Sequence, residues 1–167
     1  MIGSLRGQIL EVNPAFLLLE VQGVGFVVKS SATTIAAAHV GEERFFYIHD
    51  HVREDARDLF GFASRVEQEL FERLLTVSGV GPKVALTILS GGSPDAVRRA
   101  ILQGDLAFLT AMSGVGKKTA QKIILDLKGQ LVEENEGAVG DGEVLQALVS
   151  LGYSTSQARD AMKLIPV

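Results

Sequence analysis

The sequence of 167 residues has no cysteine, no tryptophan and only 6% aromatic residues. Without cysteine it can form no disulfide framework, no thiolate metal site and no cysteine nucleophile. It has no apolar run of the roughly 18 residues that a membrane-spanning helix needs, and its first residues lack the charged-then-apolar pattern of a signal peptide. These absences, together with 47% hydrophobic residues, favour a cytoplasmic protein with aliphatic cores and no membrane contact.

Histidine is also scarce and gives no sign of a metal site. His49 and His51 alternate along an expected strand, and His39 stands apart from them. Because nothing else completes a ligand set around these histidines, we expect no bound metal and no cofactor.

The net charge of −4 conceals an uneven distribution along the chain. Residues 1–65 carry six basic and eight acidic side chains, residues 66–131 carry eight and six, and residues 132–167 carry two and six. Only the middle segment is therefore positive. Such a modest excess suits a few phosphate contacts made largely by backbone N–H groups, and it does not suit a long electrostatic groove.

The middle segment contains one phrase twice, 35 residues apart. The first copy is Ser78-Gly79-Val80-Gly81-Pro82-Lys83-Val84-Ala85, and the second is Ser113-Gly114-Val115-Gly116-Lys117-Lys118-Thr119-Ala120. The flanking Leu74 and Ile88 recur as Leu109 and Ile123. Each copy follows an apolar helical stretch and opens another, so the repeat predicts a helix–Gly-x-Gly–helix unit used twice.

A turn of this kind is suited to binding anions. Glycine accepts positive φ and has no Cβ, so a phosphate can approach the backbone closely. The helix that follows presents unpaired N–H groups and a partial positive charge. A single Gly-x-Gly between helices is usually only a tight connection, but its duplication with lysines favours two turns that bind phosphates along a nucleic-acid backbone.

The candidate DNA-binding residues are the glycines, the residues between them, and the cations and hydroxyl that follow: Gly79, Val80, Gly81, Lys83, Gly114, Val115, Gly116, Lys117, Lys118, Thr119 and Lys122. Two sharper motifs do not fit. A Walker loop requires a glycine where this sequence has Ala111, and a dinucleotide fingerprint requires a third glycine and a preceding strand. We therefore expect no nucleotide hydrolysis.

Residues 1–63 predict a small β domain. Runs rich in Val, Ile, Leu, Phe and Tyr are separated by turn residues, at positions 2–12, 16–21, 24–29, 44–51 and 58–62. Five or six short strands in about sixty residues predict a closed barrel of the five-stranded OB type. Positions 32–38 predict a single helical turn.

Residues 64–132 switch to helical periodicity and predict five helices in two hairpins. Their start and stop signals are a capping box at Ser64-x-x-Glu67, Pro82 in a first turn, Ser93-Pro94, Asp105 as a cap, and Lys117. We expect the last helix to end near Lys128-Gly129, and we expect residues 94–103 to connect the two hairpins.

Residues 133–142 are acidic and glycine-rich and predict a flexible linker. Beyond it, residues 143–151 and 155–163 predict two helices. Residues 143–167 can bury little surface, so we expect this module to need a third helix or a partner.

Glu54 and Asp55 are adjacent carboxylates on an expected loop between two strands. Such a pair is usually a solvated turn. The alternative is a Mg²⁺ site formed with Asp50 and Asp58, in a DNA-repair enzyme or nuclease accessory that uses the same hairpins. Only that alternative predicts cleavage of labelled DNA in the presence of Mg²⁺.

Five stretches together give the chain a recognisable signature, in addition to the order of its parts. They are Met1-Ile2-Gly3-x-Leu5-Arg6-Gly7, Val52-Arg53-Glu54-Asp55-Ala56, Gly79-Val80-Gly81-Pro82-Lys83-x-Ala85-Leu86-x-Ile88-Leu89-Ser90-Gly91, Gly114-x-Gly116-Lys117-Lys118-Thr119-Ala120, and Ala147-Leu148-x-x-Leu151-Gly152-Tyr153. In these stretches the chain resembles the RuvA family, the junction-binding subunits of the bacterial branch-migration machine.

The resemblance implies an OB-fold barrel, a tandem helix-hairpin-helix domain and a mobile, UBA-like C-terminal helical module. It implies a non-enzymatic subunit that binds four-way (Holliday) DNA junctions in recombination and repair, as a homotetramer with one or two tetramers on each junction. It implies that Glu54 and Asp55 form an acidic pin at the tetramer centre.

The resemblance also implies protein partners, namely a RuvB-type AAA+ motor ATPase and a RuvC-type resolvase. The residues assigned to the motor contact are Leu148, Leu151, Tyr153 and Met162. The sequence departs from the family in one respect, because that module normally has three helices and this sequence ends at Val167 after the second. Either the sequence is truncated or the third helix is absent.

Overall fold

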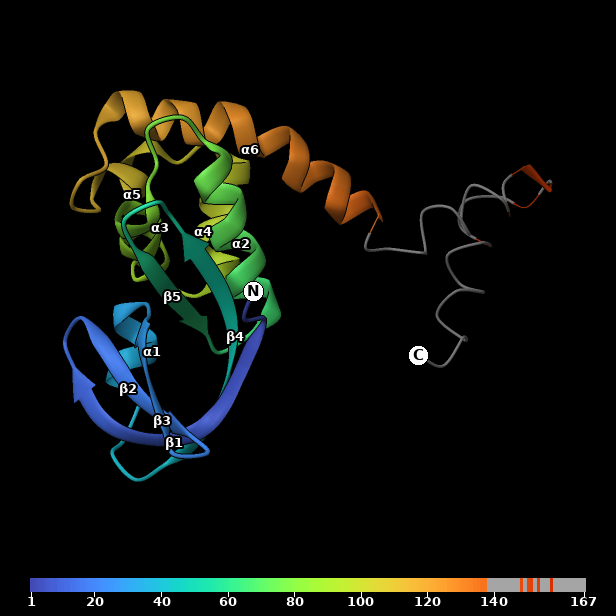
Figure 1. The fold of residues 1–167 in the computed structure, drawn as a ribbon. Coiled ribbons are helices and arrows are strands. Elements are labelled where there is room, and N and C mark those ends of the chain that lie inside the picture. Colours follow the sequence, from blue (N-terminus) through green and yellow to red (C-terminus); the bar gives the residue numbers. More distant parts are fainter. Residues whose placement is uncertain (138–147, 149, 152, 154–156, 158–167) are drawn as a thin grey trace. The chain divides into compact units, whose positions relative to one another are not determined.

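The computed structural model describes residues 1–137 together with residues 148, 150, 151, 153 and 157. The chain divides into two compact units, residues 1–128 and residues 129–167. The first unit holds a β-barrel followed by a helical domain (Figure 1).

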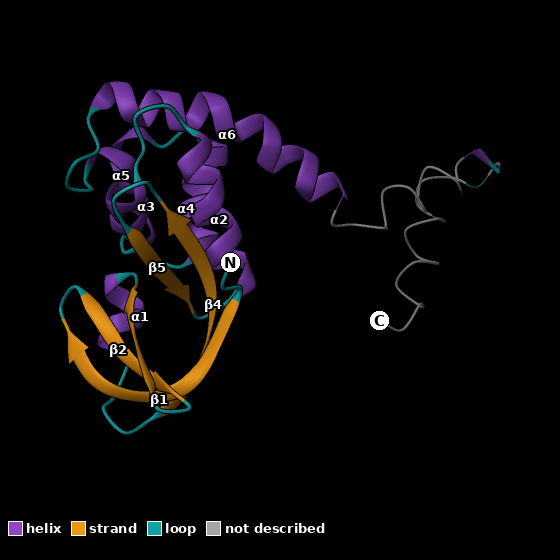
Figure 2. Cartoon of the chain, in the orientation of Figure 1, coloured by secondary structure: helices purple, strands orange, loops and turns teal. Residues whose placement is uncertain are grey.

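The N-terminal barrel is built from five strands. They are β1 (Ser4–Asn13), β2 (Phe16–Val21), β3 (Val24–Lys29), β4 (Glu43–Val52) and β5 (Arg57–Phe62), with the short helix α1 (Ala32–Ala36) between β3 and β4. The strands close in the order β1-β2-β3-β5-β4, in which only the β3–β5 pair is parallel (Figure 2). This closed five-stranded arrangement confirms the predicted OB-type barrel.

The barrel interior is filled by alternate residues of the strands, as the period of two requires. Ile9, Leu17 and Phe46 are fully buried there, and Ile35 of α1 joins the same core. Strand β1 pairs with β4 along its first half and with β2 along its second. A bulge after Ile9 allows this, because an extra residue bends the strand and increases its twist.

The helical domain consists of α2 (Arg65–Thr76), α3 (Pro82–Leu89), α4 (Pro94–Gln103), α5 (Leu106–Thr110) and α6 (Lys117–Gly137). Helices α2 and α3 form the first hairpin, α5 and α6 form the second, and α4 connects them, as predicted. The predicted side-chain caps are present, with Ser64, Ser93 and Asp105 each accepting a backbone N–H. No helix that the structure describes has the length and apolar character of a membrane span.

The last helix is longer than predicted. We expected it to end near Lys128-Gly129, but α6 continues to Gly137 and so includes the first half of the predicted linker. Gly129 does not adopt the left-handed conformation that would end a helix. The residues after it, which include Gln, Leu and Glu, are good helix formers. Residues 138–142 of the predicted linker lie outside the described residues.

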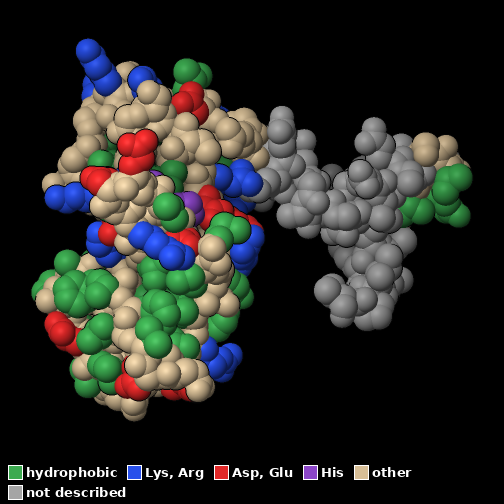
Figure 3. Space-filling model, viewed as in Figure 1, with side chains coloured by type: hydrophobic (Ala, Val, Ile, Leu, Met, Phe, Trp, Pro, Cys, Tyr) green, Lys and Arg blue, Asp and Glu red, His purple; other side chains and the backbone are tan. Residues whose placement is uncertain are grey.

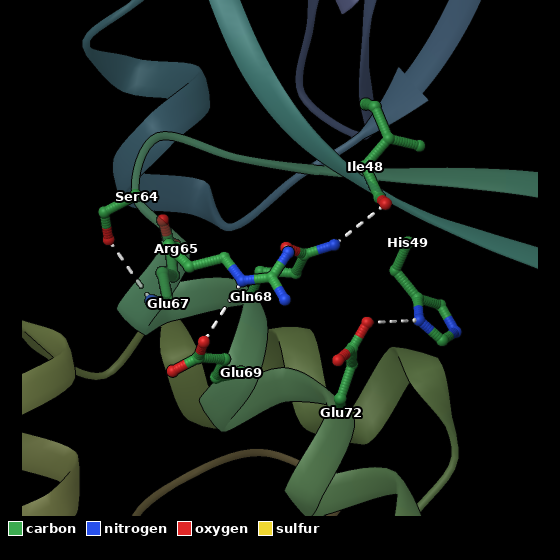
Figure 4. A network of polar contacts seen from close by, with 8 residues as sticks. All are labelled: Ile48, His49, Ser64, Arg65, Glu67, Gln68, Glu69 and Glu72. Atoms are coloured by element: carbon green, nitrogen blue, oxygen red, sulfur yellow. Dashed lines mark hydrogen bonds and ion pairs between the residues drawn. The ribbon is translucent and has the colours of Figure 1, made fainter. Parts of the chain in front are cut away.

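Buried contacts join the barrel to α2. The Ser31 hydroxyl donates a hydrogen bond of 2.8 Å to the Glu67 carboxylate, which also accepts the Ala63 N–H at 3.2 Å. The Gln68 side-chain amide donates to the Ile48 carbonyl at 2.8 Å (Figure 4). Because Ser31, Glu67 and Gln68 are all buried, these bonds lie in the junction and not on its rim.

Aromatic rings complete this junction. Phe71 of α2 packs against Phe60 and Phe62 of β5, with ring centroids 5.2 and 4.8 Å apart. His49 of β4 lies beside Phe71 and has its Nδ1 3.1 Å from the Glu72 carboxylate of α2 (Figure 4). The barrel and the first hairpin therefore form one packed body.

Candidate nucleic-acid interface

The two repeated turns share an unusual backbone conformation at their first glycine. Gly79 has φ of +89° and Gly114 has φ of +83°. This left-handed region is costly for residues with a Cβ, so both positions favour glycine. The repeat found in the sequence is thus also a repeat in backbone geometry.

The hydrogen bonds within the turns repeat with the same 35-residue offset. Three bonds from a backbone N–H to a backbone carbonyl occur in both copies. The N–H of Val77 donates to Leu74 and that of Met112 to Leu109, both at 3.2 Å; the N–H of Val80 donates to Val77 at 3.0 Å and that of Val115 to Met112 at 3.1 Å. The N–H of Ala85 donates to Gly81 and that of Ala120 to Gly116, both at 2.9 Å. Each turn therefore delivers the chain into the next helix along the same path.

The residues between the glycines anchor the turns. Val80 and Val115 are each 5% exposed, and the N–H of each is already bonded within its own turn. Neither has a free backbone donor for a phosphate. These two candidate residues therefore support the turn by packing, and their own N–H groups are already bonded within it.

The first turn of α3 offers such donors. Gly81 is its N-cap, with extended backbone (φ −94°, ψ 174°) and no side-chain cap. The N–H groups that open a helix have no carbonyl within the helix to bond. A Cβ placed on Gly81 or Gly116 would meet no atom within 4 Å, so open space lies over both glycines.

Cations surround both helix starts but in unequal number. Lys83 follows the first turn, whereas Lys117, Lys118 and Lys122 follow the second, and all four are exposed. Thr119 is half-buried. Figure 3 shows basic side chains over the helical domain and near its border with the barrel, while the visible barrel surface is mainly apolar and uncharged.

The two hairpins meet at the second turn. A Cβ on Gly114 would lie 3.9 Å from Cγ2 of Val84, which belongs to α3 of the first hairpin. The second turn therefore lies against α3, the helix that the first turn opens.

Glu54 and Asp55 form the tip of the ribbon made by β4 and β5. The Arg53 N–H donates to the Ala56 carbonyl at 2.8 Å and closes this tip. Both carboxylates are exposed. Within the described part of the chain, neither has a hydrogen-bond or ion-pair partner, so their charge faces solvent.

Asp50 and Asp58 have quite different surroundings. The Asp50 carboxylate has no solvent exposure and binds Arg57 through both oxygens, at 2.9 and 2.8 Å. This hydrogen bonding to Arg57, helped by the Ile2 N–H, lowers the pKa of Asp50 to about 2. Asp58 binds Lys29 at 2.7 Å, which lowers its pKa.

These pairings do not support the Mg²⁺ alternative. A metal site needs several carboxylates aimed at one point, but Asp50 and Asp58 are already bound by cations of the chain. No group of three His, Cys, Asp or Glu side chains suited to a metal ion is found within the residues that the structure describes. Sequence reasoning counted these aspartates with Glu54 and Asp55 because it missed their cross-strand partners.

The residues assigned to a motor contact are only partly described. Leu148 is half-buried, while Leu151 and Tyr153 are 75% and 54% exposed. The Tyr153 N–H donates to the Leu148 carbonyl at 3.1 Å. Met162 lies outside the described residues, so the structure does not bring this group together.

Comparison with known proteins covers both domains. The family model described as the RuvA N terminal domain matches residues 1–61, and the model described as a SAM-like helix-hairpin-helix tandem matches residues 71–128. The first corresponds to the barrel and the second to the two hairpins.

Similar proteins extend this likeness to nearly the whole chain. Proteins named Holliday junction branch migration complex subunit RuvA are 42% identical in Chloroflexus aggregans, 43% in Bdellovibrio bacteriovorus and 40% in Laribacter hongkongensis. Each alignment covers 99% of this chain, and it covers 89%, 89% and 91% of the relative, respectively.

Proposed function

The chain belongs to the RuvA family of Holliday junction branch migration subunits, and on that premise we propose that it binds four-way DNA junctions by shape. The observation that carries the proposal is the pair of matching turns at Gly79 and Gly114, each of which opens a helix beside exposed lysines. Phosphate contacts position a protein on DNA without reading bases. Binding is therefore independent of sequence.

Each turn binds phosphate chiefly through its backbone. The unpaired N–H groups that follow Gly81 and Gly116 donate to phosphate oxygens, helped by the positive end of the helix. Lys83 adds charge at the first turn. Lys117, Lys118 and Lys122 add charge at the second, where the Thr119 hydroxyl donates one further hydrogen bond.

Glu54 and Asp55 act as an acidic pin at the point where the DNA strands cross. Their exposed and unpaired carboxylates repel phosphates that approach the tip of the ribbon. Two unit charges about 4 Å apart repel by about 1 kcal/mol in water and more strongly at a partly dry surface. This repulsion favours an open junction and assists strand separation.

Four copies of the chain form the working unit. A junction with four arms is matched most simply by a ring in which each subunit holds one arm, and such a ring needs head-to-tail contacts that close after four copies. One or two rings act on each junction. Light scattering should give about four times the 17.8 kDa of one chain, also for a chain ending near Gln130, and a monomeric or dimeric mass would contradict the ring.

The domains divide the work between DNA and protein partners. Residues 1–63 and 64–132 bind the DNA, and residues 143–167, joined through 133–142, engage a RuvB-type AAA+ motor ATPase. Leu148, Leu151, Tyr153 and Met162 form that contact, and a RuvC-type resolvase acts on the same junction. In this proposal the chain works as the DNA-binding subunit, and nucleotide hydrolysis belongs to the motor.

A comparison of the affinities for two DNA substrates tests the proposal. A labelled four-way junction and a linear duplex of equal length are titrated with the protein at several salt concentrations, and each affinity is measured by fluorescence anisotropy. We expect the junction to bind much more tightly, with similar affinities for junctions of unrelated sequence and a steep loss with salt. Equal affinity for junction and duplex would contradict shape recognition.

A further inference from the structure

The ribbon that carries the acidic tip also carries two arginines next to it. Arg53 is the covalent neighbour of Glu54, and Arg57 is two residues beyond Asp55. Residues 50–58 contain four carboxylates and these two guanidinium groups. An arginine so placed can neutralise the tip or bind a phosphate, because guanidinium forms paired hydrogen bonds with either group. Neither event is compatible with a tip that repels DNA.

Arg57 is held in a defined position by Asp50. Its Nε and Nη2 donate to the two carboxylate oxygens at 2.9 and 2.8 Å, which uses the paired geometry of the guanidinium. Asp50 is in turn fixed by the Ile2 N–H at 2.8 Å, and its carboxylate has no solvent exposure. The exposed arginine is therefore tied to a buried acceptor.

Arg53 makes a single, longer contact with Asp58. Its Nη2 lies 3.3 Å from one Asp58 oxygen, while Lys29 occupies the other at 2.7 Å. The Asp58 side chain is 22% exposed, so it is also more sheltered than the arginine, which is 54% exposed. Each arginine that flanks the tip thus has its own aspartate on the opposite strand.

We propose that Asp50 and Asp58 are positioning residues that hold Arg57 and Arg53 away from the Glu54–Asp55 tip. The tip then keeps its full negative charge, although two cations lie beside it in the sequence. The inference rests on the proposed role of the tip in opening junctions. It adds that this role depends on two aspartates that themselves touch no DNA.

The first experiment uses the free protein. The Nε–Hε signal of Arg57 and the Nη–H signals of Arg53, which are the groups that contact Asp50 and Asp58, are observed by ¹⁵N NMR in the wild type, in Asp50→Asn and in Asp58→Asn. We expect slow hydrogen exchange of Arg57 in the wild type and fast exchange in Asp50→Asn, and the corresponding change for Arg53 in Asp58→Asn. Fast exchange of both arginines in the wild type would overturn the inference without reference to DNA.

The second experiment measures junction binding as a function of salt. Each freed arginine adds one phosphate contact, so Asp50→Asn and Asp58→Asn should steepen the slope of log affinity against log salt by about 0.9 and tighten binding about three- to tenfold at low salt. Glu11→Gln is the matched control, because it removes one exposed carboxylate elsewhere on the barrel. It should leave the slope unchanged.

Second substitutions separate release of an arginine from a simple change of charge. Asp58→Asn combined with Arg53→Gln and Lys29→Gln, the second because Asp58 also binds Lys29, and Asp50→Asn combined with Arg57→Gln, should return the slope to the wild-type value. Asp58→Asn also keeps the inference testable if the buried Asp50 does not tolerate replacement. Single aspartate variants that match Glu11→Gln would overturn the inference.

The neutral-tip variant Glu54→Gln/Asp55→Asn distinguishes failure of the inference from failure of the proposed function. We expect it to retain or tighten junction binding and to alter motor-driven branch migration. If it behaves as wild type in both assays, the proposed role of the tip is wrong, and with it the effect inferred for the aspartates. If it behaves as expected while the aspartate variants match Glu11→Gln, only the inference is wrong.

Discussion

The Ser31 hydroxyl donates a 2.8 Å hydrogen bond to the Glu67 carboxylate, and both side chains are buried between the barrel and the first hairpin. Ser31 also caps α1, and Glu67 lies in the first turn of α2. A buried polar pair of this kind tolerates little displacement, because each group loses its partner if the domains shift. The pair therefore fixes the first hairpin relative to the barrel.

Glu67→Ala should lower the free energy of unfolding by about 1–3 kcal/mol, since it leaves the Ser31 hydroxyl and the Ala63 N–H without their acceptor. Glu69→Ala on the same helix is the control. Its exposed pair with Arg65 should contribute less than about 1 kcal/mol. Urea unfolding measures both variants, and equal losses would show that the domain junction does not depend on Glu67.

Gly81→Ser separates folding from DNA binding. The backbone at Gly81 suits any residue, there is free space for a Cβ, and serine is a preferred N-cap. We expect equal stability or a gain of up to about 1 kcal/mol. We also expect roughly tenfold weaker junction binding, because the side chain occupies the place of the phosphate and takes one of its donors.

Gly79→Ser is the companion to that variant. At φ of +89° any side chain is strained, so this change should lower the free energy of unfolding by about 1–2 kcal/mol. It should also weaken junction binding. Calorimetry and junction anisotropy on both variants give the comparison. Unchanged junction binding by Gly81→Ser would argue against phosphate capture by the backbone at this turn.

The two turns should differ in their share of the electrostatic affinity. Replacing Lys83 by Gln should reduce the salt slope by about 0.9, whereas replacing Lys117, Lys118 and Lys122 together should reduce it by up to about three times as much. Lys128→Gln, an exposed lysine further along α6, is the control and should change the slope little. Equal slopes for the two turn variants would show that the extra lysines do not reach DNA.

The Asp50–Arg57 pair should give the fold a defined dependence on acid. Arg57 lowers the pKa of Asp50 to about 2, below the value of about 3.9 expected in the unfolded chain. The pair therefore stabilises the fold fully above about pH 4, and the contribution is lost as the pH falls towards 2. Unfolding of wild type and Arg57→Gln should differ by a constant amount from pH 5 to 8 and converge below pH 4. A difference that does not change with pH would contradict this.

Much of the fold can be predicted from the sequence because its signals are local. The strand boundaries follow from alternation and from turn residues, and Ser64, Ser93 and Asp105 cap the helices that they precede in the sequence. The duplicated Gly-x-Gly phrase also predicts a duplicated geometry, because glycine permits the positive φ found at Gly79 and Gly114.

Other features could not be predicted because they depend on distant parts of the chain. Glu67 reads as half of a capping box, yet its carboxylate bonds to Ser31, 36 positions earlier, and to Ala63. Asp50 and Asp58 are candidate metal ligands in the sequence, but the folded barrel places Arg57 beside Asp50 and Lys29 beside Asp58. The sequence does not predict the full length of α6, because glycine frequently ends helices whereas Gly129 remains within this one.

Amide hydrogen exchange on the protein with and without a four-way junction is the most direct test of phosphate capture by the two turns. The N–H groups that open α3 and α6 lack helix partners and should exchange rapidly in the free protein. We expect the junction to slow exchange in both residues 81–84 and residues 116–119, and an equal concentration of linear duplex to slow it less. Protection of neither turn, or of only one, would contradict the paired phosphate-binding site on which this account depends.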